Sequence, residues 1–189
     1  MSKKPAASRI RAVASDQAGV GNHRYQLYAI AWRRVHDACK AGYHLEAITL
    51  LESLLSDRME SRARHLTGAN QGFRPLGQLV QIFKTNEREP LFLDLVGRID
   101  IWRSKRNRAL HELVKFESGT LPSWDKQTAV LPAIVSEGQA LLQEFAHLDE
   151  LDRAKVGKRP ATSPNVFRAP AQTPADSSAM ARRTDERRN

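Results

Sequence analysis

Three side chains that could carry chemistry lie within six positions of the chain: Arg106, Asn107 and His111. Histidine gains and loses a proton near neutral pH, which suits His111 to general acid or base catalysis. Arg106 provides a permanent cation whose forked donors fit an oxyanion. Asn107 and His111 are four residues apart, so on a helix they can touch. The trio therefore suits proton transfer beside a bound anion.

The surrounding pattern places this arginine inside an apolar stripe. Ile99 and Trp102 begin the stripe, and the next step of four lands on Arg106. Arg106 and His111 are five residues apart, about 140° around a helix axis, so the length of the arginine is needed for both to reach one anion. Beside the stripe, basic and polar residues repeat every four positions: Arg103, Asn107, His111 and Lys115.

A plainer interpretation fits the same residues. An arginine can extend from the edge of a core stripe while a histidine on a neighbouring face stays in water. Arg58 and His65 satisfy the same loose spacing, so spacing alone is a weak signal.

Apolar residues repeat at helical spacing through the middle of the chain and predict the elements that position the trio. The third stripe stops before Pro90, the fourth runs from Pro90 to before Gly119, and the fifth follows the turn at 121–123. Glycines end the first two, at Gly42 and near Gly68. The stripes cover residues 28–39, 45–59, 76–83, 92–114 and 131–148.

Residues 23–156 contain no stretch that alternates apolar and polar positions as a half-buried strand does. We therefore expect one all-α domain over 23–156, a bundle of four long helices with one shorter connecting helix. Trp32, Trp102 and Trp124 are expected to be core or interface anchors.

The ends of the chain differ from its middle. Residues 1–22 are expected to form a flexible basic arm, and residues 157–189, rich in Pro, Ala, Ser, Thr and Arg, a disordered basic tail. The net charge of the chain is +9, of which +3 lies in the arm and +4 in the tail. This charge suits attraction to a polyanion, and it equally suits a tail kept soluble by charge.

Composition excludes several classes of protein and site. No apolar run approaches the roughly 18 residues that span a bilayer, and the N-terminus lacks the apolar stretch of a signal peptide, so a cytoplasmic protein without membrane contact is expected. The single cysteine, Cys39, cannot form an internal disulfide and is expected to pack in the core. Histidines at metal-binding spacing and glycine-rich phosphate loops are absent, so neither a metal nor another cofactor is expected.

Trp102 followed by Arg106-Asn107-x-x-x-His111, on a long helix late in a small bundle, resembles the signature of the HEPN family. In that family an arginine, often followed by a polar residue, precedes a histidine by four to six intervening residues. The stretches 52–55 (Glu-Ser-Leu-Leu) and 57–61 (Asp-Arg-Met-Glu-Ser) are similar to the second helix of some members. The resemblance covers roughly residues 23–155.

The resemblance implies a HEPN-like bundle that forms a homodimer, in which two copies of the motif meet in a cleft and cleave RNA without a metal. His111 would be the general acid or base, Arg106 would stabilise phosphoryl charge, and Asn107 would orient His111 or bind phosphate. The products would carry 2′,3′-cyclic phosphate and 5′-hydroxyl ends. The expected supporting or RNA-binding residues are Glu60, Arg103 and Lys115.

Two features of the motif region leave alternatives open. Leu113 stands where HEPN toxins paired with nucleotidyltransferase antitoxins carry a tyrosine, so adenylylation there is not expected. The acidic residues Asp57 and Glu60 lie among arginines, which predicts either a cleft lining or, as we expect, the salt-bridged face of one helix.

The leading functional hypothesis is an endoribonuclease that acts as a toxin or in defence. The alternatives are a non-catalytic helical dimerisation or RNA-binding module, and an adaptor in a larger bacterial or phage assembly, with an antitoxin or another protein as partner.

Overall fold

The computed structural model describes residues 19–68, 72–115, 118–119, 123–155 and 167. Within these ranges the chain forms helices, turns and loops, without a strand. The all-α prediction is therefore confirmed. In the same ranges, no helix combines the length and the apolar character needed to cross a membrane.

Four long helices and two shorter ones make up the described chain. The long helices bury the apolar stripes that predicted them. In order, the helices are α1 (Val20–Lys40), α2 (His44–Thr67), α3 (Leu76–Asn86), α4 (Pro90–His111), α5 (Trp124–Thr128) and α6 (Leu131–Lys155).

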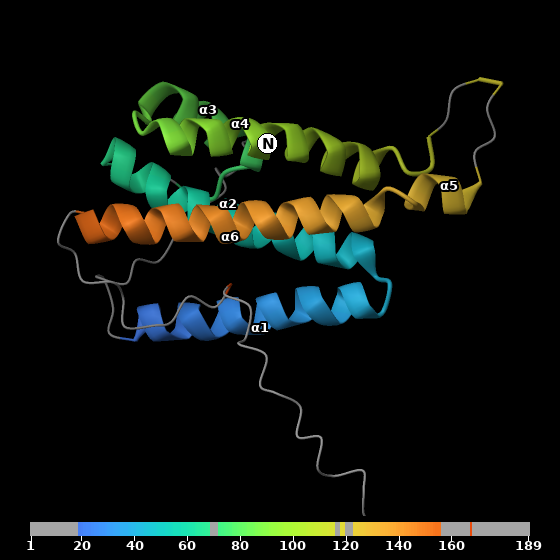
Figure 1. The fold of residues 1–189 in the computed structure, drawn as a ribbon, viewed down its shortest axis with the longest axis horizontal. Helices are drawn as coiled ribbons and strands as arrows, with labels where there is room; N and C mark the ends of the chain where they lie inside the picture. The colour runs from blue at the N-terminus through green and yellow to red at the C-terminus, as the bar shows by residue number, and fades with distance from the viewer. Residues whose placement is uncertain (1–18, 69–71, 116–117, 120–122, 156–166, 168–189) are drawn as a thin grey trace, which may run out of the picture.

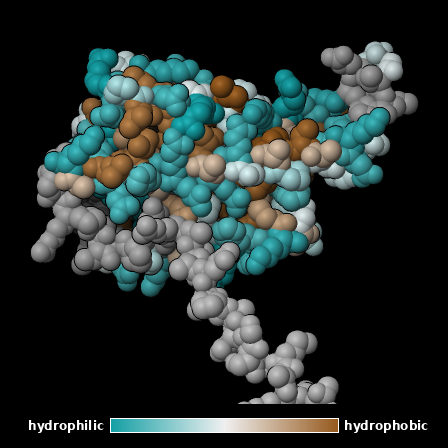
Figure 2. All heavy atoms as spheres, in the orientation of Figure 1, coloured by the Kyte–Doolittle hydropathy of each residue, from teal (hydrophilic) through white to brown (hydrophobic). Residues whose placement is uncertain are grey.

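The helices lie in three layers, which Figure 1 shows edge-on. α1 packs on α2, α2 packs on α6, and α4 packs on α6 with α3 beside it. Trp32 and Trp102 are buried in this core, as predicted, and Cys39 is partly buried against it. Hydrophilic side chains cover most of the face seen in Figure 2, with smaller apolar groups between them.

Helix ends occur where glycine and proline predict them. Gly68 adopts φ 66°, a left-handed conformation that glycine tolerates, and its amide donates to the carbonyl of Arg64 at 2.9 Å. Pro90 lies in the first turn of α4, where a missing amide hydrogen costs little. At the other end of the domain, α1 begins at Val20, three residues inside the expected arm 1–22.

The predicted end of the fourth helix is wrong. α4 ends at His111 rather than before Gly119, so Leu113, Val114 and Lys115 lie beyond the helix. Val114 is 76% exposed, and a helix without a buried apolar face gains little from being extended.

The predicted fifth helix is interrupted. It consists of the five-residue α5 and the long α6, separated by two turn residues. The hydroxyl of Ser123 accepts a hydrogen bond from the amide of Lys126 at 3.4 Å and caps α5. α5 buries no residue, while α6 begins with the buried Leu131, so packing against the core starts the second helix afresh.

Several charged side chains of α2 form ion pairs with residues outside this helix. Arg62 is buried, and it donates to Glu87 at 2.6 Å and to Asp152 at 2.8 Å. Its guanidinium carbon lies 3.5 Å from the ring centre of Phe92. Glu87 also accepts from the next two backbone amides. One buried cation therefore ties α2 to the start of α4 and to the end of α6.

Phe167 belongs to the described structure although it falls within the expected tail, 157–189. It is 1% exposed and lies against Tyr28 and Trp32 of α1. The remaining residues of the tail and of the arm before Gly19 lie outside the described part of the chain. A single aromatic residue produces no apolar period, so the composition of this stretch gives no sign of the contact.

Candidate functional site

The backbone of α4 is oriented by Trp102, which precedes the candidate arginine by one turn. The indole ring is fully buried, and its Nε1 donates to the carbonyl of Ile134 in α6 at 2.8 Å. Trp102 fixes one face of α4 against α6. Arg106 lies one turn later on the same face, so its side chain also points into the bundle.

Arg106 is 7% exposed and forms an ion pair with Glu52 of α2. The arginine that interrupts the apolar stripe therefore faces a carboxylate on the neighbouring helix. Burial lowers the pKa of Arg106, because it removes water from the charged form. An arginine nonetheless stays charged in a protein, so Glu52 supplies the charge that compensates it.

Asn107 is held by the same arginine. The Nη1 atom of Arg106 donates to Oδ1 of Asn107 at 2.6 Å. Arginine only donates, so it is the amide oxygen that must face it, and this leaves the amide nitrogen as a donor for another partner. The Nε atom of Arg106 is buried and has no hydrogen-bond partner among the described residues.

His111 is the last residue of α4 and is exposed. Arg106 and His111 differ by about 140° around the helix axis. One side chain is enclosed beside α2 and the other faces solvent, so a single chain does not bring them to one anion. Asn107 lies between the two, held by Arg106 and one turn before His111 on the same face.

The other predicted site residues are dispersed. Arg103 donates to Asp100 at 2.8 and 3.0 Å, on the side of α4 that faces α3. Lys115 is exposed beyond the helix, which corrects its predicted place in the column above His111. Glu60 accepts from the backbone amide of Arg74 at 2.9 Å and lies two turns of α2, about 12 Å along the axis, from Glu52. Glu60 therefore does not support Arg106.

Glu52, the partner of Arg106, was not among the residues expected at the site. It follows the fully buried Ile48 by four positions, so it continues the apolar side of α2 with an acidic residue. The same anomaly marks Arg106 in α4. Two opposite charges, each interrupting an apolar stripe, could have been paired from the sequence.

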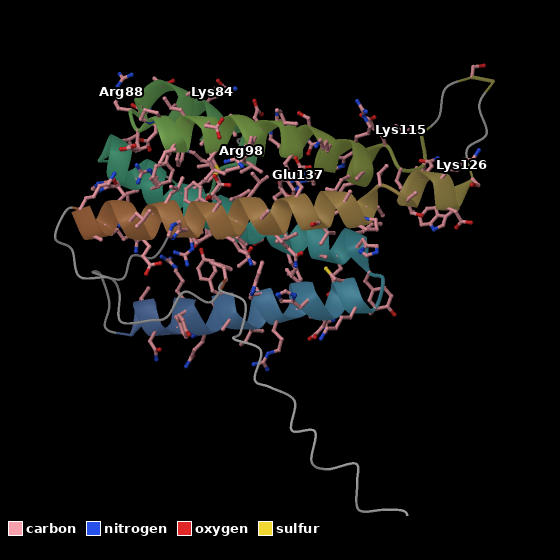
Figure 3. The ribbon with its side chains drawn as sticks, viewed as in Figure 1. Lys84, Arg88, Arg98, Lys115, Lys126 and Glu137 are labelled. Atoms are coloured by element: carbon pink, nitrogen blue, oxygen red, sulfur yellow. The ribbon has the colours of Figure 1, made fainter. Side chains whose placement is uncertain are left out.

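A hollow of about 580 Å³ lies between the turn that joins α1 to α2 and the segment from α5 to the start of α6. Tyr43 and Trp124 line it, and both rings are mostly exposed. Of the two roles expected for Trp124, a core or an interface anchor, the structure contradicts the first. The α1–α2 turn, α5 and the end of α4 lie at the same end of the bundle in Figure 1. Figure 3 places Lys115 and Lys126 at this end as well.

No group of three or more His, Cys, Asp or Glu side chains in the described ranges is arranged to hold a metal ion. Comparison of the chain with known protein families, with curated proteins and with solved structures finds no match.

Proposed function

We propose that the chain is a metal-independent endoribonuclease of the HEPN type. The observation that carries the proposal is the ion pair between Glu52 and Arg106, with Asn107 attached to it. The pair joins the two stretches on which the resemblance rests, the second helix and the Arg-Asn-x-x-x-His motif. A buried charge pair contributes little net stability compared with apolar packing, so its place in the core favours a role in positioning.

In this proposal Arg106 acts through Asn107. Its hydrogen bond to Oδ1 turns the amide nitrogen of Asn107 outward, toward the face that also carries His111. That nitrogen is a neutral donor suited to a phosphate oxygen. Glu52 and Arg106 are positioning residues, while Asn107 and His111 contact the RNA.

The reaction needs no metal or redox partner. A histidine removes the proton of an RNA 2′-hydroxyl, and the 2′-oxygen bonds to the adjacent phosphorus. The bond from phosphorus to the 5′-oxygen breaks, and that oxygen takes a proton to become a 5′-hydroxyl. One histidine cannot be base and acid at the same moment, so two copies of His111 in a dimer divide the roles.

The test is cleavage of a labelled single-stranded RNA in EDTA by the full chain. We expect His111→Ala to lower the rate by about 100-fold or more, the usual contribution of a general acid or base. His147→Ala, which removes an exposed histidine of α6, should leave the rate unchanged. Arg106→Ala should also lower the rate, with circular dichroism to establish that it folds.

Mass spectrometry of the products should find 2′,3′-cyclic phosphate ends, and sedimentation at micromolar concentration should find a dimer. A parent protein that does not cleave RNA, or a His111→Ala variant that cleaves as well as the parent, removes the proposal.

A second candidate function is RNA binding without cleavage. The observation that favours it is the enclosure of Arg106 by Glu52, which keeps the guanidinium from phosphate within one chain. Basic residues at the end of α4 and in the terminal segments would then hold the polyanion. Salt-sensitive binding that is equal in the parent and in His111→Ala, with no cleavage by either, would select this candidate.

A further inference from the structure

Phe167 is buried against the helices in the way that a side chain of a bound peptide is buried. Eleven residues, 156–166, separate it in the sequence from Lys155, the last residue of α6. Its side chain is nevertheless 1% exposed. An isolated buried anchor at the end of a polar linker is the usual form of a short peptide docked on a folded surface.

Three helices contribute to the socket around this ring. Tyr28 and Trp32 of α1 meet it edge to face, with ring centres 5.7 and 5.2 Å away and interplanar angles of 85° and 89°. The guanidinium carbon of Arg58 in α2 lies 5.2 Å from the centre of the ring. Gln143 of α6 donates from Nε2 to the backbone carbonyl of Phe167 at 2.9 Å.

Three of these contacts are made to the side chain of Phe167, and the fourth is made to its backbone carbonyl. The two rings and the cation define a pocket for a phenyl group, because edge-to-face and cation–π contacts both need an aromatic guest. The Nε atom of Arg58 is buried without a hydrogen-bond partner in the part of the chain that the structure describes. The guanidinium group instead lies over the rings of Tyr28 and Phe167. The amide of Gln143 needs only a peptide carbonyl.

The length of the linker is sufficient for the same chain to fill the socket. Gln143 lies twelve residues before Lys155, about 18 Å back along α6. The chain from 155 to 167 reaches up to about 40 Å when extended. The linker is therefore long enough for Phe167 of the same chain to reach Gln143, and a tether of this length gives an effective concentration in the millimolar range.

We propose that Tyr28, Trp32, Arg58 and Gln143 form a recognition site for a phenylalanine-bearing peptide, occupied by this chain's own segment around Phe167. Phe167 is an exchangeable occupant of this site, held between α1 and α6. Its site accepts the same peptide from solution once the resident phenylalanine is removed. This proposal is independent of RNA cleavage.

The test adds a fluorescent peptide with the sequence of residues 160–175 to the full-length chain and measures anisotropy. Full-length Phe167→Ala, whose socket is open, should bind the peptide at least about tenfold more tightly than the parent, whose tether competes. A peptide with alanine at position 167 should not bind. Gln143→Ala in the open variant should weaken binding by about tenfold, and circular dichroism should find each variant folded.

A variant that fails to fold is replaced by Phe167→Leu, which keeps an apolar side chain but loses the aromatic contacts and should bind the peptide more tightly than the parent. Equal binding of the two peptides, or equal binding by parent and open variant, overturns the proposal. A parent that sediments as a dimer while Phe167→Ala sediments as a monomer assigns the segment to a second copy and overturns its assignment to the same chain.

Discussion

The indole ring of Trp102 occupies the space that a side chain at Gly138 would need. A Cβ atom on Gly138 would lie 2.8 Å from Cζ2 and 2.9 Å from Cε2 of the ring. α4 and α6 therefore approach each other closely one turn before Arg106, and a glycine in the middle of α6 makes this approach feasible.

Gly138→Ala should destabilise the bundle, because neither the ring nor the helix backbone can move without disturbing the core. We expect a loss of about 1–3 kcal/mol in the free energy of unfolding, measured by urea denaturation. Gly97→Ala is the matched control, since a Cβ at this helical glycine of α4 meets nothing within 4 Å. It should stabilise the protein by up to about 1 kcal/mol. Equal effects of the two substitutions would contradict the close approach.

Glu52→Leu should destabilise the protein, because it leaves the charge of Arg106 buried without its partner. The carboxylate side chain is 26% exposed, so we expect a loss of about 1–3 kcal/mol rather than the larger cost of a fully enclosed pair. The double variant Glu52→Leu with Arg106→Met should recover most of this loss in urea denaturation.

Glu46→Gln provides the exposed comparison, since Glu46 pairs with Arg34 at 2.8 Å on the surface. It should change stability by less than about 1 kcal/mol. A double variant that is less stable than Glu52→Leu alone would show that the two charges are not coupled as an ion pair.

The network around Arg62 should make stability depend on pH in the acid range. Burial raises the pKa of Glu87, but hydrogen bonds from Arg62 and from two backbone amides outweigh it, so the pKa is lowered overall. The pKa of Asp152 is lowered as well, first by its hydrogen bond from Arg62. Groups with a lowered folded-state pKa stabilise the protein above their unfolded pKa and lose that contribution as the pH falls through the folded value.

The free energy of unfolding of the parent should therefore fall from about pH 5 downward. Glu87→Gln should be less stable at pH 7 by about 3 kcal/mol and should fall less steeply with acid. Glu150→Gln, at an exposed position of α6, should keep the slope of the parent. Parallel curves for the parent and Glu87→Gln would rule out this linkage.

Asn107→Asp should weaken RNA binding more than Asn107→Ala. The aspartate keeps an acceptor for Arg106 but replaces the outward donor with negative charge, which repels phosphate. We expect fluorescence anisotropy to find a loss of affinity that shrinks as salt is added, because screening weakens the repulsion. Unchanged affinity in both variants would place the RNA elsewhere.

The sequence predicted the helical stripes well because a buried face repeats every three to four residues, whatever its partner is. It failed where the outcome depended on the partner. Residues 112–115 continue a helical pattern but have no helix to pack on. Glu52 and Glu60 are both acidic residues of α2, and only the position of α4 shows that Glu52 is the partner of Arg106. Arg62, one of the arginines near Asp57 and Glu60 in the sequence, is buried and paired with Glu87 and Asp152 from distant parts of the chain.

The candidate site was predicted in its composition but not in its geometry. The positions of Arg106 and His111 around α4 follow from helical periodicity. The hydrogen bond between Arg106 and the adjacent Asn107 does not, because neighbouring residues on a helix point in different directions. The enclosure of Arg106 depends on Glu52, 54 positions earlier. Each charge interrupts an apolar stripe, which marks the two residues as candidates for a pair, but only the packing of the helices brings them together.

The packing of Phe167 against Tyr28 and Trp32 of α1 also predicts how the molecule would respond to a pulling force. A pull on the C-terminal end, from a laser trap or an unfolding motor, would reach this ring before it reached α6. The first yielding step would then be release of the phenylalanine, with a gain of about 40 Å in contour length and the bundle still intact. Loss of this one contact would therefore come before any loss of helical structure.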